Sequence, residues 1–298
     1  FGMIFPLGQP FGELRDLALA SREIWLETAA EAGIRAEPCG ALLLAHRGDE
    51  AAVLEEFAAA APDASAFELL EPGAVAERSP AVRRDGLRAG LWSPAELAVD
   101  PREALPGIAR WLKDAHGVDV RFETCVLDIE PGRLRTARGE TLHAERILVA
   151  AGREQRILFP TELEAAGMVP CKLHMMRTVP QPSGWRSGPH LAAGLTLRHY
   201  TSFADCPSTA RLRARVAEES PELDRFGVHV MASQDREGHL VLGDSHEYGT
   251  EVGPFQREEI DELILRELRP MLDVPNWALD QRWTGVYAKH PERSWVEI

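Results

Sequence analysis

The stretch ILVAAGREQ, residues 147–155, decides how the rest of the chain is interpreted. Three large apolar residues, Ile147 to Val149, predict a buried strand. Ala150, Ala151 and Gly152 follow, and small residues at a strand end let the backbone approach a ligand closely. The stretch therefore predicts a strand whose carboxyl end meets a ligand, although no glycine-rich phosphate loop precedes it.

The composition bounds the class of protein. A chain of 298 residues with 45% hydrophobic and 27% charged residues is long enough for two domains or one large α/β unit. A formal net charge of -14 argues against nucleic acid as a partner. Four cysteines without CxxC spacing indicate reduced thiols, no apolar run reaches the ~20 residues that span a bilayer, and the start lacks the basic region of a signal peptide. We therefore expect a cytoplasmic protein that contacts no membrane.

The first half alternates helical and strand patterns. Apolar spacing predicts helices over residues 11–33, 49–61 and 99–117, the first and last closed by Gly33 and Gly117. A short buried strand is predicted at 40–46 and a longer one at 118–130. A hairpin then runs from 133 through the RGE turn to Gly152, so that its second arm carries the opening stretch.

The second half contains a strong hairpin signal over residues 227–245, with Gly238 where a left-handed turn residue is needed. Residues 211–226 and 254–272 are predicted to be amphipathic helices. The mixture predicts an α/β or α+β fold.

Several blocks resemble one family of flavoproteins. DPREAL (100–105), Gly117-Val118, TCV (124–126) and ILVAAG are similar to segments of the D-amino-acid oxidase and glycine oxidase superfamily. The resemblance implies a two-domain α/β glycine-oxidase-like fold that binds FAD. It implies that Val126 meets the adenine, and that the flavin is approached by the residues Gly2, Met3, Ala150, Ala151 and Gly152.

Further blocks resemble a bacterial subgroup associated with phosphonate catabolism. These blocks are FGMI (1–4), LFP (158–160), CKLHMMRT (171–178), LTLRHY (195–200), GDSHEYG (243–249) and RWTGVYAKHP (282–291). The subgroup implies oxidation of an aminoalkylphosphonate or its N-methyl derivative, with oxygen or another electron acceptor. By this resemblance, residues 1–36, 99–168 and 283–298 belong to an FAD-binding domain, and 37–98 and 169–282 to a substrate domain.

The family pattern also implies two missing parts. A βαβ unit with GxGxxG precedes the FGMI block in the family, and a glycine-rich flavin segment follows the last block. We therefore expect the chain to be the middle of a longer enzyme.

The hairpin carries the candidate catalytic residues. His229 and Asp244 are predicted to lie opposite each other, so that the carboxylate fixes the imidazole tautomer and leaves the other ring nitrogen for substrate. His246 is a third candidate. The alternatives are a buried structural histidine, a serine hydrolase using Ser245 and His246, or a metal site at His229, His239 and His246. The last two lack the GxSxG and HExxH patterns, so no metal is predicted.

The last block departs from the family at one informative position. Amino-acid-oxidising relatives carry an arginine where this chain has Tyr287, and a phenol cannot bind a carboxylate as a bidentate cation. The substrate anion is therefore expected elsewhere, and the candidates to hold it are Lys289, His290, Arg198, His199 and Arg177. The alternative for each is a solvated surface cation. A different alternative for the whole chain is a partial flavoprotein module without turnover.

Overall fold

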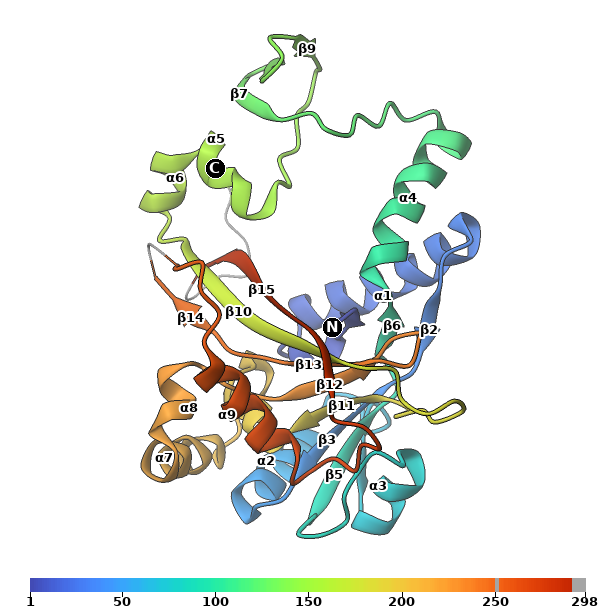
Figure 1. The fold of residues 1–298 in the computed structure, drawn as a ribbon, viewed down its shortest axis with the longest axis vertical. Coiled ribbons are helices and arrows are strands. Elements are labelled where there is room, and N and C mark those ends of the chain that lie inside the picture. Colours follow the sequence, from blue (N-terminus) through green and yellow to red (C-terminus); the bar gives the residue numbers. More distant parts are fainter. Residues whose placement is uncertain (250–251, 291–298) are drawn as a thin grey trace. The chain divides into compact units, whose positions relative to one another are not determined.

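The computed structural model describes residues 1–249 and 252–290 and divides the chain into two compact units. Unit 1 comprises Phe1–Trp111, His174–Ser245 and Gln256–Trp283, and unit 2 comprises Leu112–Leu173, His246–Phe255 and Thr284–Ile298. Helices and strands alternate along the chain (Figure 1), which confirms the predicted α/β class. Residues 1–36 pack within the same unit as 37–98, whereas the family resemblance assigns these two segments to different domains.

Unit 1 is built on a large mixed sheet. Strand β3 (Ala41–Ala45) pairs in parallel with β11 (His190–Ala193). The other neighbouring pairs from β10 to β4 are antiparallel. All five residues of β3 are buried, as expected for an uninterrupted apolar strand covered on both faces. The order is β10 (Val169–Thr178), β13 (Leu240–Gly243), β12 (Met231–Gln234), β11 (His190–Ala193), β3 (Ala41–Ala45), β5 (Ala89–Ser93) and β4 (Glu68–Leu70).

A second, small sheet in unit 1 holds the start of the chain. Its order is β1 (Met3–Ile4), β6 (Leu97–Val99) and β2 (Ala36–Pro38). The helices of unit 1 are η1 (Pro6–Gly8), α1 (Glu13–Ala32), α2 (Gly48–Ala59), α3 (Pro72–Arg78), η3 (Gly194–Arg198), η4 (Thr201–Phe203), α7 (Thr209–Glu219), α8 (Pro221–Arg225) and α9 (Glu258–Leu268). Gly33 ends α1 with a φ of 64°, so the predicted left-handed cap is confirmed.

The predicted helix over 211–226 is instead two helices, α7 and α8. Ser220 separates them with φ -150° and ψ 62°, which is not helical. The cause is Pro221, because the proline ring disfavours helical geometry at the residue before it. The hairpin prediction holds, since β12 and β13 pair antiparallel and Gly238 has a φ of 94°.

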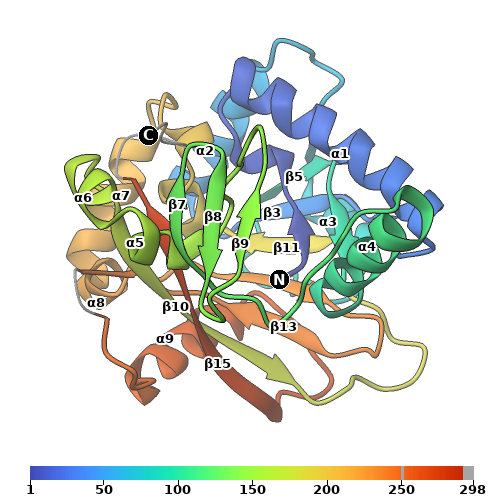
Figure 2. The same cartoon turned by 90° about the horizontal axis from the view of Figure 1, so that it is seen from above.

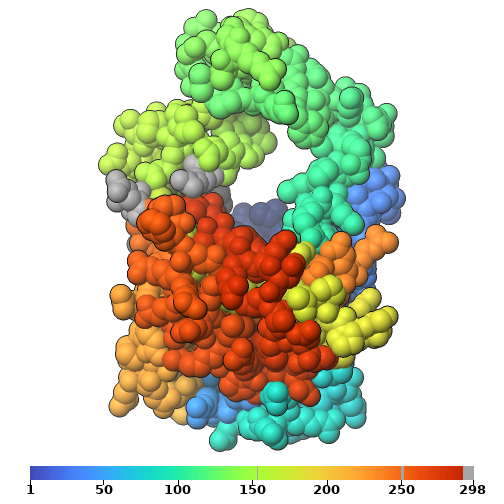
Figure 3. Space-filling view, viewed as in Figure 1, coloured from blue at the N-terminus to red at the C-terminus, as the bar shows by residue number. Residues whose placement is uncertain are grey.

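The core of unit 1 lies between the large sheet and the helices that cover it. Helix α2 buries Val53, Leu54 and Phe57, and it packs against β3 and β5. Seen from above, α1 lies on the near side of the sheet and α2 on the far side (Figure 2). Helix α9 buries Ile260, Ile264 and Leu268. The orange-to-red residues of α9 and of the start of β15 (Leu279–Lys289) form the near surface of unit 1 in the space-filling view (Figure 3).

The described part of unit 2 contains a three-stranded sheet, a 3-10 helix and two short α-helices. The sheet order is β7 (Val126–Glu130), β8 (Arg133–Thr136) and β9 (Thr141–His143). It is followed by η2 (Gly152–Glu154), α5 (Gln155–Leu158) and α6 (Pro160–Ala165), and β14 (Glu247–Tyr248) pairs with the first residues of β10. Three elements run through both units: α4 (Pro101–His116), β10 and β15. No helix among residues 1–249 and 252–290 is long and apolar enough to cross a bilayer.

The predicted strand at 147–152 is wrong for this structure. Residues 144–151 form no helix or strand, the second arm of the hairpin ends at His143, and Leu148 is 94% exposed. The predicted strand over 118–130 likewise shrinks to β7. A strand is stabilised by the ladder it forms with a neighbour, and no strand in the described part of the chain pairs with 147–152. The apolar sequence alone does not hold an extended segment in place.

Candidate functional site

The candidate site is built on one face of the large sheet in unit 1. Arg177 of β10 lies opposite Val241 of β13, and Val241 lies opposite Ser233 of β12. The next strand pairs Leu191 with Ala232, so His190 follows Ser233 in the same row. Residues directly opposite each other in a sheet point to the same face, so four side chains from four strands share one surface.

A second row of residues on the same face of the sheet leaves room for Phe1 to pack against the sheet. It contains Met175, Gly243, Met231 and Ala192. A Cβ at Gly243 would lie 2.7 Å from the sulfur of Met175 and 3.2 Å from the ring of Phe1. The hydroxyl of Ser233 donates to the carbonyl oxygen of Phe1 at 2.8 Å. Glycine at 243 therefore lets Phe1 lie against the sheet.

A cavity of about 360 Å³ lies over the first row. Its size falls in the range of sites for small ligands. Apolar groups of Ala98, Val99, Pro101 and Trp283 supply much of the wall, and the first row supplies the polar atoms. The lining comprises Phe1, Gly2, Ala98, Val99, Asp100, Pro101, Arg102, Arg177, His190, Ser233, Gln234, Asp235, Val241, Gln281 and Trp283.

Gly2 is fixed at this cavity by its backbone. Its φ is 72°, and a Cβ there would lie 2.0 Å from the carbonyl oxygen of Val99. Any other residue would clash and be strained at this position. Met3 follows in β1, opposite Ala98. The two residues that the family resemblance assigns to the flavin therefore lie at the cavity wall and next to it.

An ion-pair network closes one end of the cavity. Arg102 lies 2.6 Å from Asp100 and 3.3 Å from Asp235, and Arg177 lies 3.8 Å from Asp235. Arg177 also pairs with Asp280. The hydrogen bond from Arg102 lowers the pKa of Asp100, so this carboxyl is ionised. The predicted anion holder Arg177 thus reaches the cavity, with its charge balanced by two carboxylates.

His229 and Asp244 lie opposite each other where the hairpin leaves its regular register. Their backbones exchange two hydrogen bonds of 3.2 and 2.8 Å, and Nε2 of His229 lies 3.1 Å from Oδ1 of Asp244. Both residues are buried. The structure therefore brings this predicted pair together.

The second ring nitrogen of His229 is not open, contrary to the sequence-based expectation. Nδ1 lies 3.5 Å from Oγ1 of Thr196, which itself donates to the carbonyl oxygen of Val230 at 3.2 Å. The reason is η3, which follows β11 and lays Thr196 over the hairpin. Thr196 and Asp244 thus hold the ring from both sides.

Aromatic side chains surround the His229–Asp244 pair. The ring of His199 stacks on His229 with centroids 4.0 Å apart, and Tyr200 meets it edge-on at 5.8 Å. Burial, together with the charge of Asp244, raises the pKa of the Tyr200 phenol. Phe1, which lines the cavity, packs against Gly243, the residue that precedes Asp244.

The contacts of the remaining candidates are as follows for each unit. Arg198 is half-buried in unit 1, where it donates to the carbonyl oxygen of Val228 at 2.8 Å and lies 3.4 Å from Asp224. In unit 2, Nζ of Lys289 donates to the hydroxyl of Tyr248 at 3.1 Å, and the ring of His246 lies 6.3 Å from that of Tyr248. Tyr287 and His290 are half-buried residues of the same unit.

The remaining flavin candidates are in unit 2. Val126 begins β7 opposite Thr136, and Ala150 and Ala151 are exposed. Gly152 has a φ of 54°, and a Cβ there would meet no atom within 4 Å. These small residues leave room for a ligand, which fits the role that the family resemblance gives them.

The hydrolase alternative conflicts with the structure. Ser245 is fully buried, and its Oγ accepts a hydrogen bond from the backbone N–H of His174 at 3.2 Å. A nucleophilic serine must reach its substrate. His239, named in the metal alternative, lies 2.9 Å from Asp235 at the hairpin turn.

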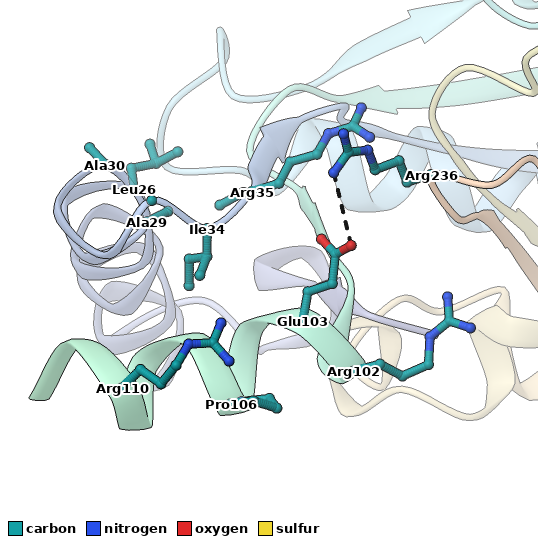
Figure 4. Close-up of a pocket in the computed structure, with 12 residues that line it drawn as sticks. Leu26, Ala29, Ala30, Ile34, Arg35, Arg102, Glu103, Pro106, Arg110 and Arg236 are labelled. Carbon is teal, nitrogen blue, oxygen red and sulfur yellow. Dashed lines mark ion pairs between the residues drawn. The ribbon is translucent and has the colours of Figure 1, made fainter. Parts of the chain in front are cut away.

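A larger cavity of about 990 Å³ lies between α1, α4 and the hairpin turn (Figure 4). Leu26, Ala29, Ala30 and Ile34 form its apolar floor, and four arginines reach its rim. Three of these arginines have acidic neighbours, such as Arg236 with Glu103 at 3.9 Å and Arg102 with Asp100. The charges are largely balanced, so the larger cavity shows little preference for an anion.

Sequence reasoning missed His190 and Ser233. The period-two pattern of the hairpin was the signal available for Ser233, since it lies two residues from Met231 on the same face. His190 begins a four-residue strand and had no such signal.

Known proteins share this fold. The sequence matches the family described as "FAD dependent oxidoreductase" (DAO) over residues 2–296. The structure is similar to L-proline dehydrogenase from P. horikoshii, with a TM-score of 0.72, 17% identity, and coverage of 96% of this chain and 70% of that one.

Two further solved structures are similar. For glycine oxidase from Bacillus cereus the TM-score is 0.71 and the identity 16%, covering 95% of this chain and 70% of that chain. For L-alpha-glycerophosphate oxidase from Mycoplasma pneumoniae with FAD bound, the TM-score is 0.68 and the identity 16%, covering 96% and 71%. No curated protein matches the sequence. The glycine-oxidase-like fold is confirmed, and the chain belongs to the DAO family of FAD-dependent oxidoreductases.

Proposed function

We propose that the protein oxidises the C–N bond of a small amine with FAD as its cofactor. The main support for this proposal is the cavity of about 360 Å³ beside Gly2, which is lined by apolar groups and by a row of polar side chains. The family supplies the cofactor, and glycine oxidase and L-proline dehydrogenase are named for substrates that contain a C–N bond.

The residues that would hold FAD are Gly2 and Met3 in unit 1 and Val126, Ala150, Ala151 and Gly152 in unit 2. FAD, when bound, supplies the acceptor for the hydride that leaves the α-carbon of the amine. The sequence lacks a GxGxxG loop, so we propose that the pyrophosphate is held by a segment outside these 298 residues.

The chain's own part is orientation and exclusion of water. The apolar groups of Ala98, Val99, Pro101 and Trp283 exclude water from the amine, and this desolvation favours its neutral form. The His229–Asp244 pair, which Thr196 contacts from the other side of the ring, does not line this cavity but lies on the same hairpin as Ser233. We assign His229, Asp244 and His246 to the catalytic region on the family resemblance.

The proposed substrate is an aminoalkylphosphonate or its N-methyl derivative, as in the phosphonate-catabolism subgroup. Tyr287 replaces the arginine that would bind an α-carboxylate. Arg102 and Arg177 both reach the cavity, and a phosphonate would compete with Asp235 for these guanidinium groups. Lys289, His290, Arg198 and His199 remain further candidates. We also propose a cytoplasmic location and oxygen as an electron acceptor.

Steady-state kinetics tests this proposal. The complete flavoenzyme should show a specificity constant for aminomethylphosphonate, 2-aminoethylphosphonate or their N-methyl forms at least tenfold above that for glycine or D-alanine. Oxygen uptake is compared with reduction of a dye acceptor in the same assay. A higher specificity constant for either amino acid would refute the phosphonate substrate, and a flavin that no amine reduces would favour a module without turnover.

A further inference from the structure

His190 occupies a place in the cavity that the proposed reaction has not yet used. It begins β11 and follows Ser233 in the row of side chains that faces the cavity. It also lines the cavity, although only 2% of its surface is exposed to solvent. A histidine in this position either fills space or contacts whatever the cavity binds.

The hydrogen bonds of His190 define which ring atom can contact a ligand. Nε2 lies 3.1 Å from the carbonyl oxygen of Leu97, to which it can only donate. In a neutral imidazole the proton then resides on Nε2, and Nδ1 presents a lone pair. The hydrogen bonds made within residues 1–249 and 252–290 leave Nδ1 unused. We infer that this lone pair faces the cavity of about 360 Å³, although His190 also lines a second cavity of about 160 Å³.

His190 stays neutral across the working range of pH. Burial lowers its pKa to about 4, and the hydrogen bond to the carbonyl oxygen of Leu97 acts in the opposite direction. The other charged groups that line the cavity are Arg102, Arg177, Asp100 and Asp235, which pair with one another. A base this weak cannot remove a proton from an alkylamine, whose pKa is several units higher. It can only accept a hydrogen bond.

We propose that Nδ1 of His190 accepts a hydrogen bond from an N–H of the bound amine, and that His190 is thereby a specificity-determining residue. This inference rests on the proposed amine substrate. No proton is transferred from the amine while this hydrogen bond orients its nitrogen. The hydrogen bond to the carbonyl oxygen of Leu97 keeps the imidazole ring of His190 from rotating. A site built around an N–H donor rejects an analogue without one, because the buried acceptor is then left unpaired.

Nuclear magnetic resonance of the flavin-loaded enzyme, with ¹⁵N-labelled histidine, tests the acceptor directly under anaerobic conditions. The probes are aminomethylphosphonate and its N,N,N-trimethyl counterpart, which carries the same anion but no N–H. We expect Nδ1 of His190 to be unprotonated from pH 5 to 9 and to shift only with aminomethylphosphonate. A protonated Nδ1, or equal shifts with both probes, would overturn the inference.

Glycine and N,N,N-trimethylglycine provide a second pair of probes. If a shift that depends on N–H occurs with glycine alone, the acceptor role stands and the phosphonate substrate fails. If His190 shifts with an N–H probe and no amine reduces the flavin, binding stands and oxidation fails. A change in the flavin spectrum on adding an N–H probe, without a shift at Nδ1, would also exclude the acceptor role.

Two variants and a control separate this role from packing. His190→Phe should raise KM for the preferred amine about tenfold, the scale of one hydrogen bond, while kcat changes less than threefold. His190→Gln, whose amide can both donate to Leu97 and accept from the ligand, should recover at least part of the loss. The matched control is Leu191→Val, because Leu191 points to the other face of the sheet and is equally buried. An unchanged KM in folded His190→Phe would contradict the proposal.

Discussion

At the scale of single residues, the contacts of His229 decide what it can do. Its ring is held by Asp244 at 3.1 Å and by Thr196 at 3.5 Å, and His199 stacks on it. A histidine held on both edges is oriented by the protein before any ligand arrives. We therefore expect His229 to act as a fixed polar group rather than as a residue that moves to carry a proton.

We predict that His229→Ala lowers amine turnover of the flavin-loaded enzyme by ~10²-fold, the usual scale for losing a positioned polar group. Asp244→Asn should cause a smaller loss, because it disturbs only the orientation and tautomer of the ring. Turnover per folded molecule and the thermal midpoint are measured together, with flavin content as the control. A variant that melts early but keeps its turnover would show that His229 only packs.

At the scale of elements, several boundaries follow from local chemistry and others do not. Gly33 and Gly238 both have the positive φ that the sequence predicts for them. Gly33 ends helix α1, and Gly238 lies in the turn of the predicted hairpin, which is present. The helix over 211–226 is broken by Pro221, which the apolar spacing concealed. Helix α4 was predicted correctly, yet its packing depends on a residue that helix propensity disfavours.

That residue is Gly107, and we predict that Gly107→Ala destabilises unit 1. A Cβ at this position would lie 2.3 Å from Cγ2 of Ile34. Overpacking of this kind costs about 1–3 kcal/mol, which exceeds the ~1 kcal/mol that alanine adds to a helix. Thermal unfolding of Gly107→Ala, Ile34→Ala and the double variant gives the coupling between the two sites.

Gly73→Ala is the matched control for this prediction. Gly73 lies in helix α3, and a Cβ there would meet no atom within 4 Å. Its replacement should leave stability unchanged or raise it by up to about 1 kcal/mol. If Gly107→Ala stabilises the protein as Gly73→Ala does, the close packing of α4 against Ile34 does not explain why residue 107 is glycine.

At the scale of the whole molecule, the chain matches the DAO family over residues 2–296 and spans 70–71% of the three solved structures described above. The candidate flavin residues occur in both units. Gly152 begins only the three-residue 3-10 helix η2, and none of them begins an α-helix, whose N-terminal amides bind a pyrophosphate.

We therefore predict that this 298-residue chain binds FAD at least ~100-fold more weakly than a fusion protein in which a βαβ unit with GxGxxG precedes Phe1. Two charge-assisted hydrogen bonds to the pyrophosphate, at about 1.5–3 kcal/mol each, suffice for such a difference. Fluorescence titration of both proteins with FAD measures it, and riboflavin, which lacks the pyrophosphate, serves as the control ligand. Equal dissociation constants of the two proteins for FAD would contradict the proposal that residues outside this chain bind the pyrophosphate.

The sequence by itself determined the α/β class, the turns at Gly33 and Gly238, the pairing of His229 with Asp244 and the family, because these depend on local conformation, on period-two alternation and on recurring blocks. Only the tertiary structure decided that ILVAAG is not a strand, that Thr196 occupies the second nitrogen of His229, and that His190, Ser233, Val241 and Arg177 face one cavity. A strand needs a neighbouring ladder, and a cavity needs side chains from strands far apart in the chain. Both depend on long-range pairing, which no local pattern contains.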